Sequence, residues 1–237
     1  MAVGTSMAPY ADLRSIPMDV APYRLSGAVY GAMLNHRSAL AVLGDQVGKP
    51  PYNAAPKAPV LQIKPRNTFA LSGDIIAVPQ GVDELEVAAN LGLVIGRTAC
   101  RVTREDALDH VAGYLIVVDV SVPYAGHHRP QIRCKARDGF CPLGPRVTAR
   151  ALAPDPGALR IRTRIDGVLA QAADTAALIR PAAELLAAVT EFMTLRPGDV
   201  LAMGAAAPAP RARPGQTVVV EIDGLGALSN RFLGTGS

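Results

Sequence analysis

Short apolar segments that end at glycine, proline or polar residues recur along the chain, and they limit its fold more than any other feature. Their length and their branched residues are typical of β-strands. Strands are expected over residues 28–34, 60–64, 75–78, 91–97, 114–122, 159–165, 168–171, 217–222 and 227–233. Asp166 and Gly167 separate two of these segments, and an Asp-Gly pair predicts a two-residue hairpin turn there.

Two segments predict helices. Thr103 and Asp106 have the spacing of a capping box, which predicts a helix over residues 103–112. Apolar residues at helical spacing follow Pro181, which suits the first turn of a helix, so a second helix is expected up to about Met193. Many strands and few helices together indicate an α+β, β-rich fold.

The composition indicates one globular unit. The chain has 237 residues, of which 49% are hydrophobic, and this is enough for one sizeable core. Residues 1–24 are expected to form a flexible tail, and residues 25–237 a single domain. No apolar run approaches the roughly 20 residues of a membrane-spanning helix, and no signal-peptide pattern is present. We therefore expect a cytoplasmic protein without a membrane partner.

Charge and cysteine content narrow the class of ligand. The net charge is +4, but the arginines are scattered and aromatic residues make up only 4% of the chain, so a nucleic-acid surface is not expected. An acidic small molecule suits this modest positive charge better. The three cysteines are an odd number without CxxC spacing, which argues against a disulfide framework or a zinc site.

Two stretches predict a small-molecule site. Residues 113–121 (GYLIVVDVS) are mostly apolar, and Asp119 interrupts them. Residues 135–145 (KARDGFCPLGP) combine an ammonium, a guanidinium, a carboxylate and a thiol. A packed core cannot hold such groups unpaired, so we expect them to serve a ligand or one another.

Basic residues surround Lys135. If its segment is extended, Arg133, Lys135 and Arg137 point to one side, where three cations would receive a diacid. Further candidates are an acid in the RDGF turn, and two histidines and a cation on a preceding loop. They are Asp138, His127, His128 and Arg129. The histidines rank first as general bases because histidine titrates near neutrality.

Five longer runs, in this order, resemble the fumarylacetoacetate hydrolase family over residues 28–233. They are LGLVIGR (91–97), AGYLIVVDVS (112–121), KARDGFCPLGP (135–145), EFMTLRPGDVLAMG (191–204) and VEIDGLGALSN (220–230). Three segments are similar to one subgroup, the isomerase/decarboxylases of 4-hydroxyphenylacetate (homoprotocatechuate) degradation, in their N-terminal half or separate first subunit. They are LNHRS (34–38), IKPRNT (63–68) and RDGFCPLG (137–144).

The resemblance implies a mixed β-sandwich roll with a few short helices, a Mg²⁺ or Mn²⁺ site, and dicarboxylate or tricarboxylate substrates. The family holds its metal with a Glu-x-Glu pair and an Asp from a later strand, oxygen ligands that suit such cations. The matching positions are Ala88, Asn90 and Asp119, so the resemblance leaves Asp119 alone as a metal ligand. Glu84 and Glu86 lie four residues too early, and we interpret them as a solvated acidic loop.

Asp119 and Lys135 match the family and are the expected catalytic pair; the alternative is a buried ion pair that serves only the fold. Three functions follow from this pattern. The chain is an isomerase/decarboxylase subunit with a degenerate metal site, a non-catalytic partner of a homologous metal-competent subunit, or a metal-free dicarboxylate binder. A homodimer, or a complex with such a subunit, is expected.

Overall fold

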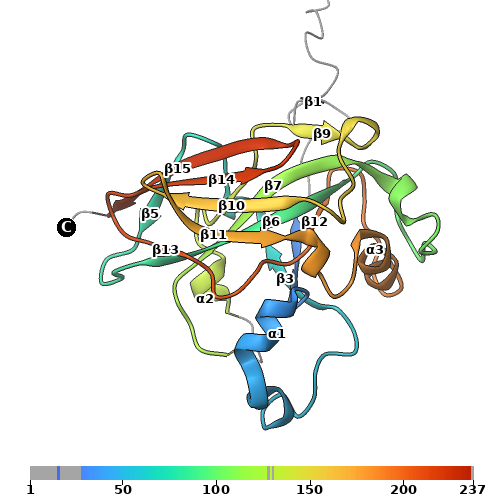
Figure 1. The fold of residues 1–237 in the computed structure, drawn as a ribbon, viewed down its shortest axis with the longest axis horizontal. Coiled ribbons are helices and arrows are strands. Elements are labelled where there is room, and N and C mark those ends of the chain that lie inside the picture. Colours follow the sequence, from blue (N-terminus) through green and yellow to red (C-terminus); the bar gives the residue numbers. More distant parts are fainter. Residues whose placement is uncertain (1–14, 17–27, 127–128, 130, 236–237) are drawn as a thin grey trace, which may run out of the picture.

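The computed structural model describes residues 15–16, 28–126, 129 and 131–235. In this part of the chain the largest element is an eight-stranded mixed sheet in the order β1-β9-β7-β6-β12-β2-β3, with β13 paired to β6 (Figure 1). Its strands are β1 (Ser15–Ile16), β2 (Val29–Met33), β3 (Val60–Lys64), β6 (Leu85–Ile95), β7 (Val111–Ser121), β9 (Val147–Ala149), β12 (Val200–Ala202) and β13 (Arg211–Ala212).

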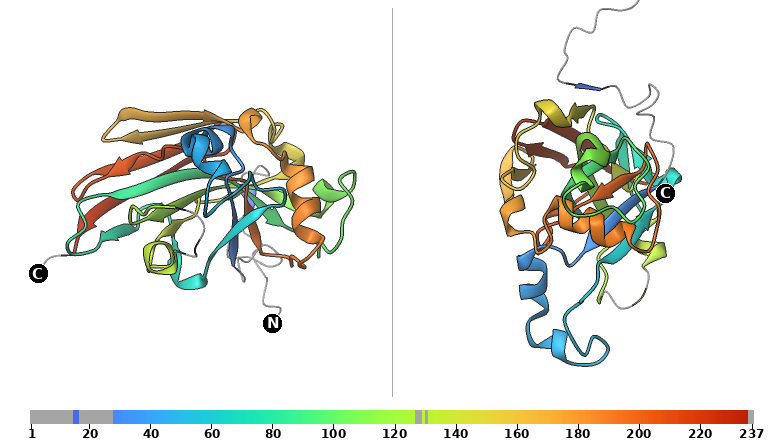
Figure 2. Two further views of the ribbon diagram at one scale, coloured as in Figure 1. Left: turned by 90° about the horizontal axis from the view of Figure 1, so that it is seen from below. Right: turned by 90° about the vertical axis from the view of Figure 1, so that its right-hand side faces the viewer.

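A five-stranded sheet in the order β11-β10-β14-β15-β5 packs against the first (Figures 1 and 2). Its strands are β5 (Ile75–Val78), β10 (Arg160–Ile165), β11 (Val168–Asp174), β14 (Thr217–Ile222) and β15 (Gly226–Gly234), and a short parallel pair consists of β4 (Phe69–Ala70) and β8 (Cys141–Pro142). Val87 and Val118 of the first sheet share one core with Val218 and Phe232 of the second. Each such buried side chain stabilises the fold by about 1.5–3 kcal/mol. The expected α+β, β-rich sandwich is confirmed.

The β6–β7 hairpin crosses the centre of the large sheet. Its apolar residues are buried along most of both strands, because neighbours cover the sheet on both faces. β6 begins at Leu85, which is fully buried and pairs with Ala212. The interpretation of residues 84–86 as a solvated loop is therefore wrong: Leu85 and Glu86 are the first residues of a central strand.

The described helices are short. They are α1 (Arg37–Leu43), α2 (Ile132–Lys135) and α3 (Ala182–Thr190), with 3₁₀ turns η1 (Gly44–Gly48), η2 (Arg66–Thr68), η3 (Ala107–His110), η4 (Arg150–Leu152) and η5 (Thr175–Ala177). α1 and η1 project away from the sheets (Figures 1 and 2). None of the helices in the described ranges is long and apolar enough to span a membrane.

One helix prediction is confirmed and the other is wrong. Pro181 occupies the N-cap position of α3, close to the expected start, and the helix ends at Thr190, three residues before the expected Met193. Thr103 and Asp106 do form the reciprocal hydrogen bonds of a capping box, at 2.9 and 3.2 Å. Only the turn η3 follows them, however, because Val111 already belongs to β7. The strong strand preference of the residues after 111 overrides the helix signal before them.

Candidate functional site

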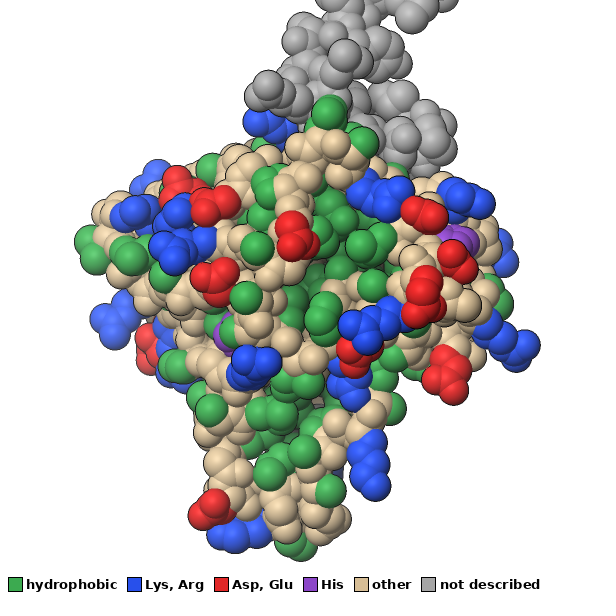
Figure 3. Space-filling view, turned by 45° about the vertical axis from the view of Figure 1, so that its right-hand side comes forward, with side chains coloured by type: hydrophobic (Ala, Val, Ile, Leu, Met, Phe, Trp, Pro, Cys, Tyr) green, Lys and Arg blue, Asp and Glu red, His purple; other side chains and the backbone are tan. Residues whose placement is uncertain are grey.

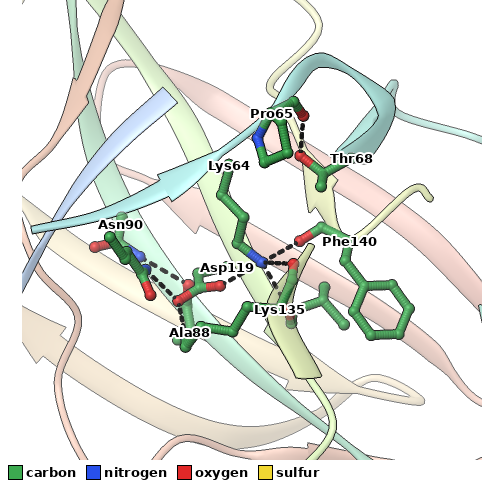
Figure 4. A network of polar contacts seen from close by, with 10 residues as sticks. Lys64, Pro65, Thr68, Ala88, Asn90, Asp119, Lys135 and Phe140 are labelled. Atoms are coloured by element: carbon green, nitrogen blue, oxygen red, sulfur yellow. Dashed lines mark hydrogen bonds and ion pairs between the residues drawn. The ribbon is translucent and has the colours of Figure 1, made fainter. Parts of the chain in front are cut away.

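The buried carboxylate of Asp119 on β7 is contacted by three side chains. Figure 4 shows two of them, Lys64 and Lys135. Lys64 Nζ, at the end of β3, lies 2.6 Å from Oδ1. Lys135 Nζ, at the end of α2, lies 2.5 Å from Oδ2. Gln62 Nε2, also on β3, donates to Oδ2 at 2.5 Å. These four residues, Gln62, Lys64, Asp119 and Lys135, are referred to below as the Asp119 cluster.

The Lys64 ammonium is surrounded by oxygen atoms of the protein. Besides its ion pair, Nζ donates to the backbone carbonyls of Val120, Lys135 and Phe140 at 2.8, 2.7 and 2.9 Å. Only 2% of its side chain is exposed. Burial lowers the pKa of Lys64 although Asp119 opposes the change, and four oxygen acceptors keep it an ammonium. Lys64 thus holds the site together and does not face a ligand.

Lys135 is the cation that faces open space. Its side chain is 11% exposed, and its ammonium stands 5.2 Å from the centre of the Tyr124 ring. Burial lowers the pKa of Lys135, but the Asp119 carboxylate and Tyr124 raise it by more, so the net shift is upward. Lys135 therefore stays protonated at neutral pH and can receive an anion.

The Asp119 cluster carries excess positive charge. Burial raises the pKa of Asp119, but the Lys64 and Lys135 ammonium groups lower it by more, so the carboxyl is ionised at any ordinary pH. Two ammonium groups then share one carboxylate within the cluster. The cluster therefore has a net positive charge, and a negatively charged ligand beside Lys135 would neutralise it.

A cavity of about 390 Å³ lies next to the cluster, which is large enough for a small acid. Gln62, Asp119 and Lys135 line one side of it, and apolar residues of α1 line another. At its rim, Arg211 pairs with Glu86 at 3.4 Å. In the space-filling view, hydrophobic side chains gather where the projection that carries α1 meets the body of the molecule (Figure 3).

The residues at the family's metal positions do not fit a divalent cation. Ala88 lies directly opposite Asp119 in the β6–β7 register and offers no ligand. The amide of Asn90 is used by the backbone: Nδ2 donates to the Ala88 carbonyl at 2.9 Å, and Oδ1 accepts from Gly204 N at 3.0 Å. The described residues contain no group of three or more His, Cys, Asp or Glu side chains arranged for a metal ion. The remaining carboxylate already pairs with two cations.

The condition for three cations on one side, an extended segment around Lys135, is not met. Cys134 N and Lys135 N both donate to the Gln131 carbonyl, which makes α2 a helical turn. In this turn the Lys135 carbonyl accepts a hydrogen bond from Lys64 Nζ at 2.7 Å. The row of three cations on one side is therefore absent from the described site. Arg133 is exposed, and its carbonyl accepts from Arg137 Nε at 2.9 Å.

The other predicted residues have separate positions. Asp138 is exposed in its turn and accepts from Asn67 Nδ2 at 2.7 Å. Arg129 lines a second cavity beside the first, together with Lys135. His127 and His128 lie outside the described residues, so their roles stay predictions.

Sequence reasoning missed Lys64 and Gln62. The available signal for Lys64 was a lysine within an apolar strand directly before a proline, in the IKPRNT segment. Gln62 lies two residues earlier, so it points to the same side of β3 as Lys64. Their partner Asp119 is more than fifty residues away in the sequence, and no local pattern connects them.

The sandwich and its central Asp119 cluster define a member of one enzyme family. The family model described as fumarylacetoacetate (FAA) hydrolase C-terminal matches residues 28–233, and the chain belongs to this family. A relative from Salmonella dublin, described as a 4-hydroxyphenylacetate degradation bifunctional isomerase/decarboxylase, is 43% identical over 208 residues. The match covers 87% of this chain and 47% of the relative, so the chain spans about half the length of the curated relatives of this name that it matches.

Solved structures have the same fold. The 2-hydroxyhepta-2,4-diene-1,7-dioate isomerase from Mycobacterium marinum is 27% identical with a TM-score of 0.72, over 90% of this chain and 77% of that chain. The fumarylpyruvate hydrolase from Pseudomonas aeruginosa, solved in complex with Mn²⁺ and pyruvate, is 26% identical with a TM-score of 0.75, over 87% of this chain and 89% of that chain.

Proposed function

We propose that this chain is a subunit of an isomerase/decarboxylase of 4-hydroxyphenylacetate catabolism and that it has no metal site of its own. Its substrates would be 5-oxopent-3-ene-1,2,5-tricarboxylate for decarboxylation and 2-hydroxyhepta-2,4-diene-1,7-dioate for isomerisation. The 43% identity to a relative with that printed activity supports the reaction class. The observation that carries the proposal for this chain is the excess positive charge of the Asp119 cluster beside the cavity.

Both reactions place negative charge on a substrate oxygen. In decarboxylation the electron pair of the broken C–C bond enters a conjugated carbonyl. In isomerisation the 2-hydroxyl group of the dienol loses its proton to give a dienolate, and a chain carbon then takes up a proton as the carbonyl forms. A fixed ammonium in a site that excludes water stabilises such an enolate. Lys135 would supply this charge, since it lines the cavity and is largely buried. Its raised pKa makes it a cation and not a general base.

Asp119 and Lys64 would act through Lys135 as positioning residues. Asp119 Oδ2 fixes the Lys135 ammonium, and Lys64 fixes Asp119 from its other oxygen. The strongly lowered pKa of Asp119 means that this carboxylate does not exchange protons near neutrality. The proton carrier of an isomerisation must then lie elsewhere, and His127 and His128 remain its predicted candidates.

Two alternatives use the same cluster. The chain would be a non-catalytic partner of a homologous metal-competent subunit, or a metal-free dicarboxylate binder. The neutral residues Ala88 and Asn90 favour both, since the fumarylpyruvate hydrolase structure is described with Mn²⁺. Assembly as a homodimer and a cytoplasmic location stay predictions.

The test compares the purified chain, a homologous chain with an intact Glu-x-Glu pair, and their mixture. Decarboxylation and isomerisation are assayed with EDTA and with Mg²⁺. We expect the isolated chain to bind glutarate equally well with EDTA, and the mixture to turn over faster than the metal-competent chain alone. Metal-dependent turnover by the isolated chain would refute the proposed degenerate site. A mixture no faster than its metal-competent member would leave the metal-free binder as the better description.

A further inference from the structure

A second cavity, of about 310 Å³, lies beside the first. The two share a wall made of Met33, Gln62, Tyr124 and Lys135. Gln62 and Lys135 therefore border both cavities. The proposed function uses only the first cavity, and the second has no part in it.

The lining of the second cavity differs from that of the first. Its other walls are mainly branched apolar residues of β3, with Ile132 of α2. Ile63 and Ile132 are 52% and 63% exposed, so apolar surface faces solvent there. Its cations are Lys135, shared with the first cavity, and Arg129. Apolar walls with a cation at one end suit a carboxylic acid that has an apolar body.

The Gln62 side chain is held in place within the wall that the two cavities share. Its amide nitrogen donates to Asp119 Oδ2 at 2.5 Å. Gly31 lies directly opposite it on β2. A Cβ at position 31 would lie 3.0 Å from Gln62 Nε2 and 3.1 Å from its Cγ, so glycine leaves the room that the side chain occupies. Gly31 on β2 and Gln62 on β3 together place the amide in the wall that the two cavities share.

The nitrogen of the Gln62 amide has a hydrogen-bond partner, Asp119 Oδ2. The amide oxygen, Oε1, is buried and has no hydrogen-bond partner among the described residues. An unpaired buried acceptor is unfavourable, so Gln62 Oε1 does not stabilise the folded state. Asp119 keeps both ammonium partners without Gln62. A role in separating the cavities explains a glutamine here better than a role in stability does.

We propose that Gln62 is a specificity-determining partition between two compartments of one ligand site. The second compartment takes the apolar arm of an acid whose carboxylate Lys135 holds, and Gln62 limits how far that arm extends. This inference shares with the proposed function the use of Lys135 as the carboxylate anchor.

The test measures binding of two acids by isothermal titration calorimetry. Glutarate represents a short diacid, and 4-phenylbutanoate represents a carboxylate with an apolar arm. We expect Gln62→Ala to raise the preference for 4-phenylbutanoate over glutarate, measured as the ratio of their two dissociation constants, about tenfold. Gly31→Ala should act in the same direction, because its Cβ displaces the glutamine without replacing it.

Two further variants make the result specific. Gln216→Ala, an exposed glutamine bonded to Asp166, should change neither affinity. Ile132→Glu added to Gln62→Ala should abolish the gain for 4-phenylbutanoate, because it places a carboxylate in the second cavity. An unchanged preference for 4-phenylbutanoate in both Gln62→Ala and Gly31→Ala, with glutarate still bound, overturns this inference alone. Failure of the wild-type chain to bind either acid overturns the anchor role of Lys135 and the proposed function with it.

Discussion

Replacing Asp119 by Asn keeps the shape of the side chain and removes the charge that two buried ammonium groups share. Removing one partner of a buried ion pair costs about 3–5 kcal/mol, because the other charge remains buried without compensation. We therefore expect the free energy of unfolding at pH 7 to fall by about 3–5 kcal/mol in Asp119→Asn. Urea unfolding followed by circular dichroism measures this difference.

The pH dependence of the same difference follows from the pKa of Asp119. Its folded pKa is lowered far below the ordinary value of 3.8, so its contribution to stability is present above that value. The contribution is lost as the pH falls toward the folded pKa. The advantage of the wild type over Asp119→Asn should be constant between about pH 5 and 7 and shrink by up to about 1.4 kcal/mol per pH unit below 3.8.

Asp138→Asn is the matched control. This carboxylate is exposed and accepts a hydrogen bond from Asn67, so its replacement should change the free energy of unfolding by less than about 0.5 kcal/mol. The reasoning would be refuted by a loss under about 1 kcal/mol in Asp119→Asn at pH 7. It would also be refuted if the difference between wild type and Asp119→Asn were the same at pH 7 and pH 3.

Three further outcomes are expected. Lys135→Met should weaken glutarate binding at least about tenfold by calorimetry, whereas exposed Arg133→Met should leave it unchanged. Lys64→Met should cost more than about 3 kcal/mol in urea unfolding, because a buried carboxylate and three carbonyls lose their donor; a smaller loss contradicts its structural role. Ala88→Glu with Asn90→Glu should create Mn²⁺ binding that the wild type lacks, and an unchanged electron paramagnetic resonance signal of free Mn²⁺ would argue against these ligand positions.

The strands could be predicted because their signals are local. The segments at 60–64, 75–78 and 217–222 have the bounds expected from their apolar residues and flanking breakers. The hairpin turn at Asp166 and Gly167 also forms, with φ of 49° and 81°. In each case residues within one strand length determine the conformation.

The site could be predicted only in part. Asp119 and Lys135 were recognisable, but their geometry depends on Lys64 and Gln62, which belong to a strand far away in the sequence. The row of Arg133, Lys135 and Arg137 depended on an extended segment, whereas residues 132–135 form the helical turn α2. A four-residue segment is too short for periodicity to separate the two conformations.

Lys64 also has a consequence for the order in which the chain folds. Its ammonium bonds to carbonyls 56, 71 and 76 residues further along the sequence. No shorter piece of chain can supply those acceptors, so burial of this charge waits until β3, β7 and the Phe140 turn have met. The anion site therefore requires all three of these parts of the chain to be in their folded positions. An acid that engages Lys135 would bind the folded chain alone and protect it against unfolding.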